Sequence, residues 1–452
     1  MQQIQRPGDT LAPTSVRLAS MAPLRQSGGN SGAVYSLDTS VEEVILRQTQ
    51  SVSAARLSVG FIASLAVFCG TSAWAQTYGD DATTPGQAAV AGALDTVASP
   101  ATSPYAGMLG AIDALPDAAS RANALGQLGP QAYRIMPRLS IQSMDATDRE
   151  IRGYLAQRRE MALDASAAVP VSGDRTITAM VSYGLRQGTY KARIDRPAAN
   201  SDSRSIRAAF DMSPMPGLIV GASIGIDGLD AALDRSQRPR STMFNAGVTP
   251  YASYTKGRFY VDATAGYTRS WYQLRRQVSY SGFTDQLQSG PQGDNAAASI
   301  EAGGIVKLGV LRAQPFAGLQ YRYADLGGLV ESGGSAALAV ARFKSEAVRT
   351  TLGMRASATL RKGNWTLRPS VDAQWQRELR SRPESRIEAV FINGGTPIFT
   401  LPSWRYDRDT AVVGASVSAV HGERTSLRLS YSGEFANDRH VHGFAVTASR
   451  RF

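Results

Sequence analysis

The sequence predicts an all-β membrane fold: an antiparallel transmembrane β-barrel of about twelve strands, plugged by an N-terminal α-helix. From Asp174 to the end of the chain, apolar residues alternate with polar or charged ones, the pattern of strands with two different faces. Short and long gaps between these segments alternate, as they do in outer-membrane barrels. A charged helical segment, 143–165, precedes the first strand.

The composition narrows the class of protein. The formal net charge is +11, and arginine carries nearly all of the basic side chains. These arginines are scattered along the chain, whereas nucleic-acid binding calls for a basic stripe or cluster. Scattered arginines suit the polar interior of a barrel. We therefore expect no nucleic-acid partner and no cofactor.

Residues 1–75 are interpreted as a polar prelude followed by a secretory signal peptide. An apolar run covers 57–70, too short for a transmembrane helix. It is followed by Ala73-Trp-Ala75, the small-x-small pattern of a cleavage site, which places cleavage before Gln76. The sequence therefore predicts export by the Sec route.

The only cysteine, Cys69, lies inside this apolar run. A lipoprotein signal is excluded because the bulky Phe68 precedes it where a small residue is required. After cleavage no disulfide can form. The late start of the signal has two explanations that remain open: a true start at Met21, or an extended signal segment.

Three segments precede the strands. Residues 76–103 are rich in Ala, Thr, Pro and Gly and are predicted to be a flexible linker. Residues 104–142 are predicted to form short helices, because Pro116 and Pro130 break the pattern. Residues 143–170 are predicted to form a helix that threads the pore.

This last helix is the strongest helical signal in the chain. Ser143 is suited to cap it, and Asp145 and Asp148 suit its first turn. Residues 143–165 span about 35 Å, roughly a bilayer. Its charged character fits either a solvated surface helix or a helix inside a polar pore. Its expected pore-lining side chains are Arg149, Arg152, Arg158 and Arg159.

The strands are expected at 174–187, 203–213, 217–228, 242–256, 258–276, 294–308, 311–324, 346–361, 364–379, 409–420, 424–436 and 440–452. A soluble sandwich would bury the apolar faces, whereas a membrane barrel turns them to lipid. Strands of about 11–16 residues exceed the soluble norm of about 5–6 and favour the barrel. The long loops are expected at 188–202, 229–241, 277–293, 325–345 and 380–408.

An even number of strands places both barrel ends on one side of the membrane. The short turns mark that side as periplasmic, and the long loops are expected outside the cell. The last strand alternates and stops on an aromatic residue. The expected signal for the barrel-assembly machinery comprises Phe444, Val446, Ala448 and Phe452.

The residues offer little chemistry. The histidines are His421, His440 and His442, and they fall in a turn and at the start of the last strand. Exposed turn histidines are a simpler explanation than a metal pair. No H-E-x-x-H, P-loop, C-x-x-C or G-x-S-x-G motif is present. No catalytic and no metal site is predicted.

From about residue 104 onward the chain resembles the autotransporter (type V secretion) family. The phrases that carry the resemblance stand in the family's order: Ala246-Gly-Val-Thr-Pro-Tyr-Ala-Ser-Tyr254, Pro315-Phe-Ala-Gly-Leu-Gln-Tyr321, Glu331-Ser-Gly-Gly-Ser-Ala-Ala-Leu338, Pro369-Ser-Val-Asp-Ala-Gln-Trp375 and Tyr431-Ser-Gly-Glu-Phe435. By this resemblance the structural motif positions are Pro315, Gly318, Tyr321, Glu331, Trp375, Asp409, Gly414 and Tyr431.

The resemblance implies a monomeric twelve-stranded translocator barrel in the outer membrane, surrounded by lipid and inserted by the barrel-assembly machinery with periplasmic chaperones. Family members usually export a long passenger, but only residues 76–140 are available here, so the passenger is expected to be very short or absent. No Asn-Asn cleavage pair precedes the first strand. Two other functions stay open: a surface adhesin or structural barrel that uses its loops, and a diffusion pore.

Overall fold

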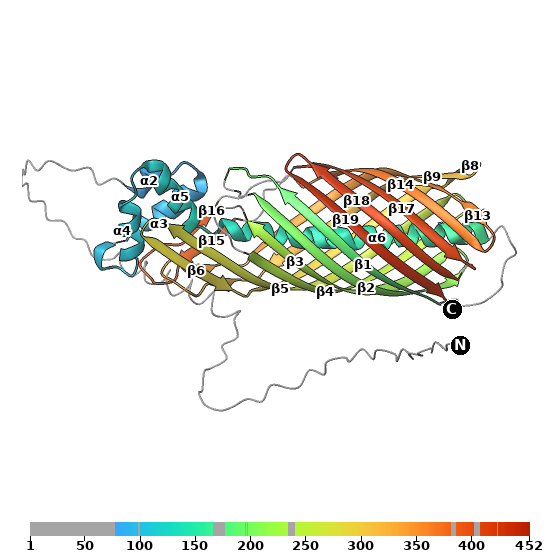
Figure 1. The fold of residues 1–452 in the computed structure, drawn as a ribbon, viewed down its shortest axis with the longest axis horizontal. Coiled ribbons are helices and arrows are strands. Elements are labelled where there is room, and N and C mark those ends of the chain that lie inside the picture. The colour runs from blue at the N-terminus through green and yellow to red at the C-terminus, as the bar shows by residue number, and fades with distance from the viewer. Residues whose placement is uncertain are drawn as a thin grey trace, which may run out of the picture. The chain divides into compact units, whose positions relative to one another are not determined.

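The computed structural model describes residues 77–97, 100–165, 177–194, 196, 198–233, 240–380, 386–401, 407–422 and 424–452 (Figure 1). The predicted signal peptide, with Ala73, Ala75 and Gln76, lies outside the described residues.

Twelve long antiparallel strands close into a barrel, which confirms the predicted fold class. Strand β1 pairs with β2 on one side and with the last strand, β19, on the other, so the sheet has no free edge. The strands are β1 (Ile177–Tyr190), β2 (Ala199–Met215), β3 (Leu218–Leu233), β4 (Arg240–Lys256), β5 (Phe259–Tyr280), β7 (Gln292–Gly304), β9 (Leu311–Leu326), β12 (Phe343–Ala358), β14 (Trp365–Glu378), β17 (Asp409–His421), β18 (Thr425–Ala436) and β19 (Arg439–Arg451). The short strands β8 (Val306–Leu308) and β13 (Leu360–Lys362) extend two of the short turns.

The two faces of the wall follow the alternation in the sequence. On β1, Val181 is 56% exposed on the outer face, whereas Ser182 is 3% exposed and points inward. The short turns depend on glycine: Gly217 has φ +79°, and an added Cβ there would lie 2.2 Å from the Thr255 carbonyl oxygen. The connections between the strands alternate in length, so that one end of the barrel carries short turns and the opposite end carries long loops.

The long loops contain more structure than the sequence predicts. Strand β5 extends beyond the barrel and pairs with β6 (Phe283–Ser289) as a hairpin. The expected loops 325–345 and 380–408 supply a second sheet of four short strands. Its order is β10 (Leu329–Val330), β11 (Leu338–Val340), β15 (Ile387–Phe391) and β16 (Phe399–Leu401). Apolar runs such as Leu338–Val340 explain this sheet, because they are buried by pairing between the two loops.

Residues 77–97 and 100–135 form a group of short helices, which we call the helical cap. The prediction of a flexible linker over 76–103 is wrong for 78–94. Thr84 caps the second helix through the Gln87 amide, and the small residues around Val90 and Leu94 pack closely enough to be buried. The elements are α2 (Tyr78–Asp81), α3 (Pro85–Leu94), η1 (Pro100–Thr102), α4 (Ala106–Asp113), α5 (Ala118–Leu128) and η2 (Pro130–Ile135).

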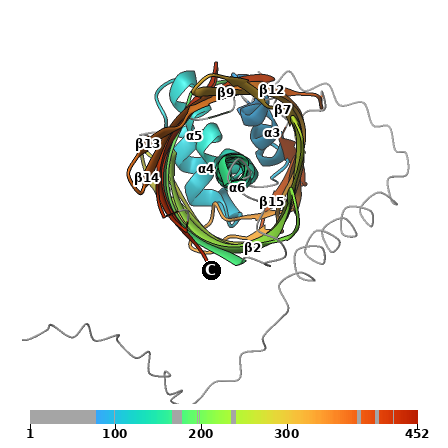
Figure 2. The same cartoon turned by 90° about the vertical axis from the view of Figure 1, so that its right-hand side faces the viewer.

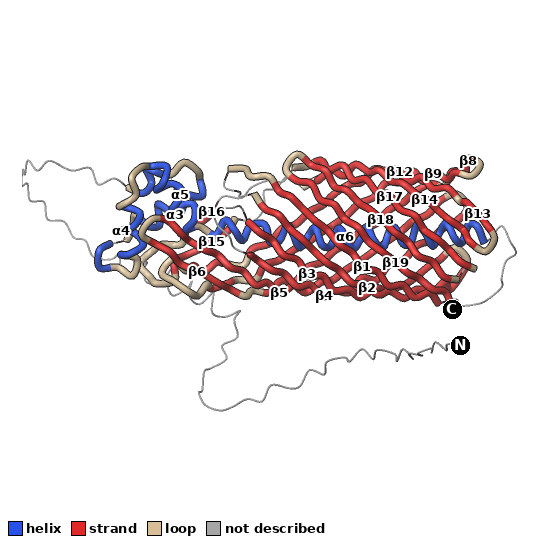
Figure 3. The backbone as a smooth tube through the Cα atoms, in the orientation of Figure 1, coloured by secondary structure: helices blue, strands red, loops and turns tan. Residues whose placement is uncertain are grey.

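The cap packs on the long-loop end of the barrel (Figures 1 and 3). One apolar core joins Leu109 and Leu125 of the cap to Leu338 and Phe391 of the loop sheet. The ring of Tyr105 meets Phe391 edge-on, with 5.7 Å between the ring centroids. Cap and loops therefore fold as one unit.

Helix α6 (Met136–Ala165) follows the cap and runs inside the barrel (Figure 2). It begins at Met136, not at the predicted Ser143, because Pro137 is well tolerated in a first turn. Ser143 lies inside the helix and donates a hydrogen bond to Asp227 at 2.9 Å. Within the described ranges, no helix combines the length and the hydropathy needed to cross a membrane.

Candidate functional site: the occupied lumen and its cap

Helix α6 occupies the lumen from one end to the other. Near the long loops, the Ser140 hydroxyl lies 2.7 Å from the Tyr272 hydroxyl. Near the short turns, Arg368 donates to Asp164 at 2.6 Å. Thirty residues of helix measure about 45 Å, enough to cross the barrel. The N-terminal end of α6 therefore lies with the long loops, and its C-terminal end lies with the short turns.

The four arginines predicted to line the pore all reach carboxylates on barrel strands. These carboxylates come from four different strands of the wall, so the helix is fixed in rotation as well as in depth. The pairs are Arg149 with Glu434, Arg152 with Glu301 at 2.9 Å, Arg158 with Asp211 at 2.8 Å, and Arg159 with Asp262 at 2.8 Å.

The reverse polarity also occurs, with carboxylates on α6 and arginines on the wall. Asp145 accepts from Arg322 at 2.9 Å and from Arg349 at 2.6 Å. Asp164 accepts from Arg368 and Arg312 near the short turns. The sequence predicted none of these wall arginines as individual partners. The signal that points to them is their place on the polar face of each alternating strand.

The ion pairs in the lumen fix the position of α6 more than they stabilise the fold. Removing two charges from water costs several kcal/mol per ion, and their attraction only roughly offsets that cost. A shifted or rotated helix would leave charges buried without partners, which is strongly unfavourable. The pairs therefore select one placement of α6 among many.

The two sides of the lumen differ. Charged partners of α6 lie on both sides, for example Glu301 on β7 and Glu434 on β18. Strands β14 to β19, with β1 and β2, also present many small side chains, and a cavity of about 150 Å³ lies there beside the helix. The small residues that line it include Gly184, Ser203, Ser205, Ser370, Gly414, Ser418, Ser430, Ser432, Gly443 and Thr447.

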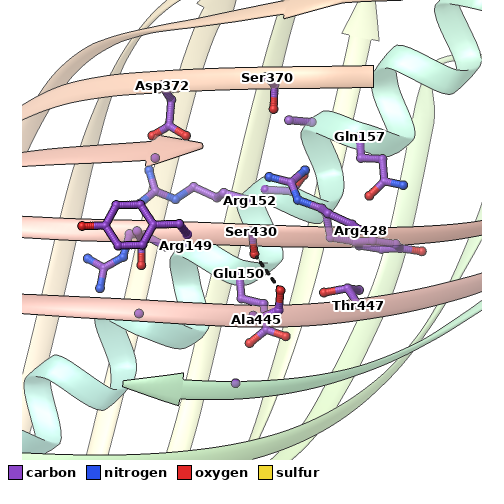
Figure 4. Close-up of a pocket in the computed structure, with 18 of the residues that line it drawn as sticks. Arg149, Glu150, Arg152, Gln157, Ser370, Asp372, Arg428, Ser430, Ala445 and Thr447 are labelled. Atoms are coloured by element: carbon purple, nitrogen blue, oxygen red, sulfur yellow. Dashed lines mark hydrogen bonds between the residues drawn. The ribbon is translucent and has the colours of Figure 1, made fainter. Parts of the chain in front are cut away.

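Figure 4 shows this cavity between α6 and strands β14, β18 and β19. Arg428 crosses it and donates to the Gly153 carbonyl of α6 at 2.8 Å. A Cβ on Gly153 would lie 3.2 Å from the Arg428 guanidinium, so glycine at this position allows the close contact. Across the wall, Ser430 donates to the Ala445 carbonyl at 3.4 Å.

A second cluster fastens the cap to the loops, and the sequence did not predict it. Arg276 at the extended end of β5 is fully buried and pairs with Glu331, with 2.8 Å between Nε and Oε1. The same guanidinium donates to the carbonyls of Gln127 at 2.9 Å, Leu128 at 3.2 Å and Ala336 at 2.8 Å. One side chain thus joins barrel, loop and cap.

Tyr133 completes this cluster. Its hydroxyl donates to Glu331 from the cap side. Burial, together with the nearby Glu331 carboxylate, raises the pKa of Tyr133 above its ordinary value, so the hydroxyl stays protonated and remains a donor. Every polar group at the centre of the joint therefore has a partner, which makes burial of the ion pair tolerable.

Four of the motif positions taken from the family resemblance take part in specific contacts. Glu331 is the carboxylate of the cap joint. Trp375 donates from its indole nitrogen to Asp409 at 2.9 Å, so two predicted positions meet on the outer face. Tyr431 lies 2.8 Å from the His442 ring nitrogen, and its ring packs on Phe444 with 5.2 Å between centroids.

The other motif positions are two glycines that leave space for neighbouring side chains and two residues on the outer face of the barrel. A Cβ on Gly318 would lie 2.7 Å from the Thr351 hydroxyl, and one on Gly414 would lie 2.2 Å from the Asp372 carboxylate. Both glycines make room for a neighbouring side chain. Pro315 and Tyr321 lie on the exposed outer face of β9.

The last strand lies where the barrel closes. Phe444, Val446 and Ala448 are exposed on the outer face of β19, between β18 and β1. The Phe452 amide donates to the Ile177 carbonyl at 2.8 Å, so the final residue pairs with the start of the first strand. The predicted assembly residues therefore form one outward stripe at the seam.

The histidines do not form a site. His421 packs on Trp365, with 4.7 Å between ring centroids, and His442 contacts Tyr431. Among the described residues, no three His, Cys, Asp or Glu side chains are grouped closely enough to hold a metal ion.

Comparison with known proteins identifies the barrel. Residues 180–432 match the model of the autotransporter β-domain. The translocator domain of the autotransporter NalP from Neisseria meningitidis superposes with a TM-score of 0.51 at 13% identity, covering 68% of this chain and 98% of that one. The β-domain of the Bordetella autotransporter BrkA gives a TM-score of 0.47 at 17% identity, covering 62% of this chain and all of that one.

Among curated proteins, an extracellular serine protease of Serratia marcescens is 25% identical over 190 residues. That alignment covers 42% of this chain and only 18% of the protease. A second extracellular serine protease from the same organism is 24% identical over 190 residues. The chain thus matches a small part of these relatives.

Proposed function

This chain belongs to the autotransporter family, whose β-domain forms an outer-membrane barrel, and we propose that its N-terminal segment has crossed the lumen and folded outside as the helical cap. The observation that supports this proposal is the polarity of α6. Its N-terminal end lies with the long loops, where the cap shares a core with the loop sheet. Because the cap is wider than a single helix, it is expected to fold only after it has left the lumen.

The proposed orientation places the long loops and the cap at the cell surface. The short turns and Phe452 then face the periplasm, as in other outer-membrane barrels. Helix α6 remains as a plug that links the exported cap to its own pore. Residues 77–135 act in this proposal as a short passenger that stays attached.

Biogenesis is proposed to follow the Sec route and the barrel-assembly machinery, with periplasmic chaperones as intermediates. The outward stripe of Phe444, Val446, Ala448 and Phe452 at the seam supports this proposal. Deletion of Phe452 should lower the amount of heat-modifiable barrel in outer-membrane fractions. Unchanged levels would contradict a role for the terminal residue in insertion.

Single cysteines test the orientation sharply, because Cys69 is the only native cysteine. In a Cys69→Ser background, Ala119→Cys marks the cap, Ser281→Cys marks a long loop, and Arg258→Cys marks a short turn; all three positions are exposed. A membrane-impermeant maleimide added to intact cells should label the first two and spare the third. Labelling of Arg258→Cys alone would reverse the proposed orientation, and a labelled loop with an unlabelled cap would place the cap inside.

A surface adhesin is the second candidate. This function is favoured because strands of the long loops form a sheet that shares one apolar core with the cap. If the cap and loops bind a target, removing residues 77–135 should abolish cell binding while the barrel persists. A diffusion pore is less favoured because α6 fills much of the lumen, and a Δ143–165 variant should conduct more than the intact chain.

Catalysis is not part of the proposal. The proteases named above share only a small part of their length with this chain. We expect the purified full-length chain to show no hydrolysis of casein. Measurable turnover that a serine-directed inhibitor abolishes would contradict this expectation.

A further inference from the structure

A groove of about 850 Å³ lies on the outer face of the barrel, close to the long-loop end. Six adjacent strands form it, from β19 through β1, β2, β3 and β4 to β5. Strand register arranges its outward side chains in two rows. The lower row, nearer the middle of the barrel, is Phe444, Leu185, Arg204, Gly228, Phe244 and Trp271. The upper row is His442, Gln187, Asp202, Asp230, Thr242 and Gln273.

Arg204 is the exception in the lower row, since its neighbours are apolar, aromatic or glycine. Within the described part of the chain its guanidinium forms no hydrogen bond and no ion pair. A nearby outward arginine behaves differently: Arg269 pairs with Asp294 at 2.6 Å. An arginine among apolar side chains at a membrane interface is most favourable when an anionic group meets it.

The floor of the groove beside Arg204 is open. Gly228 is its register partner on β3, and a Cβ added to Gly228 would contact no atom within 4 Å. On the far side, Phe244 and Trp271 form an aromatic wall with 5.8 Å between ring centroids. Space for a ligand therefore lies directly against the unpaired guanidinium.

The surroundings indicate an amphipathic ligand. Below the lower row, the next outward residues are Tyr183, Ile206 and Ile226, which expose an aromatic ring and two aliphatic side chains. Acyl chains would pack there. Above, the upper row offers amide, hydroxyl, imidazole and carboxylate groups, which can all bond to sugar hydroxyls.

We propose that this groove binds a phosphorylated glycolipid of the membrane leaflet on the long-loop side. Arg204 holds the phosphate through a bidentate contact, the upper row hydrogen-bonds the sugar, and the acyl chains lie along the apolar band. The choice of leaflet rests on the orientation in the proposed function, whereas the binding chemistry does not.

A free phosphate or a simple anion fits the groove poorly. Asp202 and Asp230 are direct register partners in the upper row, so two carboxylates lie side by side and repel an anion that lacks other contacts. The apolar flank contributes only if the ligand has chains to bury. The combined chemistry therefore selects a lipid.

The test uses the full-length chain, purified and stripped of lipid in detergent micelles and titrated while binding is followed by native mass spectrometry. The probes are lipid A, its dephosphorylated form, and phosphatidylglycerol. We expect lipid A to bind best and Arg204→Gln to weaken its binding roughly tenfold. Arg269→Gln is the matched control and should bind as the unmodified chain does.

A second variant protects the test against misfolding of the first. Gly228→Leu fills the groove without removing a charge and should also lose lipid A binding, with heat-modifiability confirming a folded barrel. Equal binding of lipid A by Arg204→Gln and the unmodified chain would overturn the proposal. Equal binding of dephosphorylated lipid A or phosphatidylglycerol would overturn the ligand class.

Failure of this inference and failure of the proposed function are distinguishable. Cysteine labelling of cells reports on orientation and not on the groove. Micelle binding reports on the groove whichever way the barrel faces.

Discussion

The chain holds its N-terminal segment in two different ways. Inside the lumen, α6 is held mainly by arginine–carboxylate pairs that reach around the wall, such as Arg159 with Asp262. In the helical cap, the preceding helices are held by an apolar core around Leu109 and Leu125, with the fully buried ion pair of Arg276 and Glu331 at its edge.

The two regions are held differently because the barrel wall faces lipid, whereas the cap and loops face water. A barrel wall that turns its apolar face to lipid leaves a mostly polar face for the lumen. Polar contacts therefore dominate there, and the apolar clusters around α6, such as Ile151 and Leu155 with Met180, are small. The cap and loops have no lipid to face and bury their apolar residues against one another. The lumen thus fixes position, and the cap supplies stability.

The largest expected effect comes from Arg276→Ala. Glu331 would remain buried without its counter-charge, which costs about 3–5 kcal/mol. The cap should separate from the loops while the barrel persists. Limited trypsin digestion followed by mass spectrometry should show fast cleavage within 77–135 and an unchanged barrel fragment. A cap that stays resistant would show that the apolar core alone holds it.

Leu125→Ala tests that core directly. Leu125 has no exposed surface, so its truncation should cost the cap about 3 kcal/mol. The urea concentration at which the cap becomes cleavable should fall. Ala119→Gly, on the exposed face of the same helix, is the control and should shift the midpoint much less. Equal shifts would indicate that the cap is not a cooperative unit.

In the lumen, Arg159→Gln should cost about 1–3 kcal/mol. The penalty is smaller than for Arg276, because Asp262 keeps a hydrogen bond from Ser253 at 2.6 Å. Planar-bilayer recordings should show more frequent brief openings as α6 moves in the pore. The double variant Arg159→Gln and Asp262→Asn should restore part of the closure. Unchanged recordings would mean that this pair does not position the helix.

Alkaline pH separates the two regions in another way. Burial raises the pKa of Tyr105 to about 12, above the ordinary tyrosine value of about 10. The pKa of Tyr105 is higher in the folded state than in the unfolded state. The contribution of Tyr105 to the free energy of unfolding is therefore complete below pH 10 and is lost as the pH rises from 10 to 12. The cap should become cleavable in that window before the barrel changes. In Tyr105→Phe this step should shrink, and an identical profile would exclude Tyr105 as its source.

The smallest expected effect is that of Arg193→Ala. Arg193 pairs with Asp407 at 3.1 Å but is 49% exposed, and such pairs contribute about 0–1 kcal/mol. Cap resistance and conductance should both stay as in the unmodified chain. A change comparable to that of Arg276→Ala would show that surface pairs also hold the loops in place.

Much of the barrel could be predicted because its signal is local. Strand β14, for example, covers Trp365–Glu378 where 364–379 was expected, since alternation and turn glycines are visible in short windows. The arginines of α6 were also recognisable as pore-lining residues, because a long charged helix directly before a barrel fits the polar lumen. Their partners were not, as Arg152 and Glu301 are far apart in the chain.

Short helices were expected over 104–142, where α4 and α5 lie. The first helices of the cap, its packing on the loops and the loop sheet were missed for a physical reason. Ala-rich helices and strands of two or three residues have weak local preferences, and they become ordered only when they are packed together. Glu331 shows the same limit: the family resemblance marked its position, but its role depends on Arg276, Tyr133 and the carbonyls of the cap.

The sequence by itself determined the membrane barrel, its number of strands, its charged helix and its family, because each is encoded in repeating local patterns. Only the tertiary structure decided which charges pair across the lumen, that the cap and loops form one core, and that Arg204 stands unpaired beside an open groove. These features depend on contacts between residues far apart in the chain, and such contacts exist only once the barrel has closed.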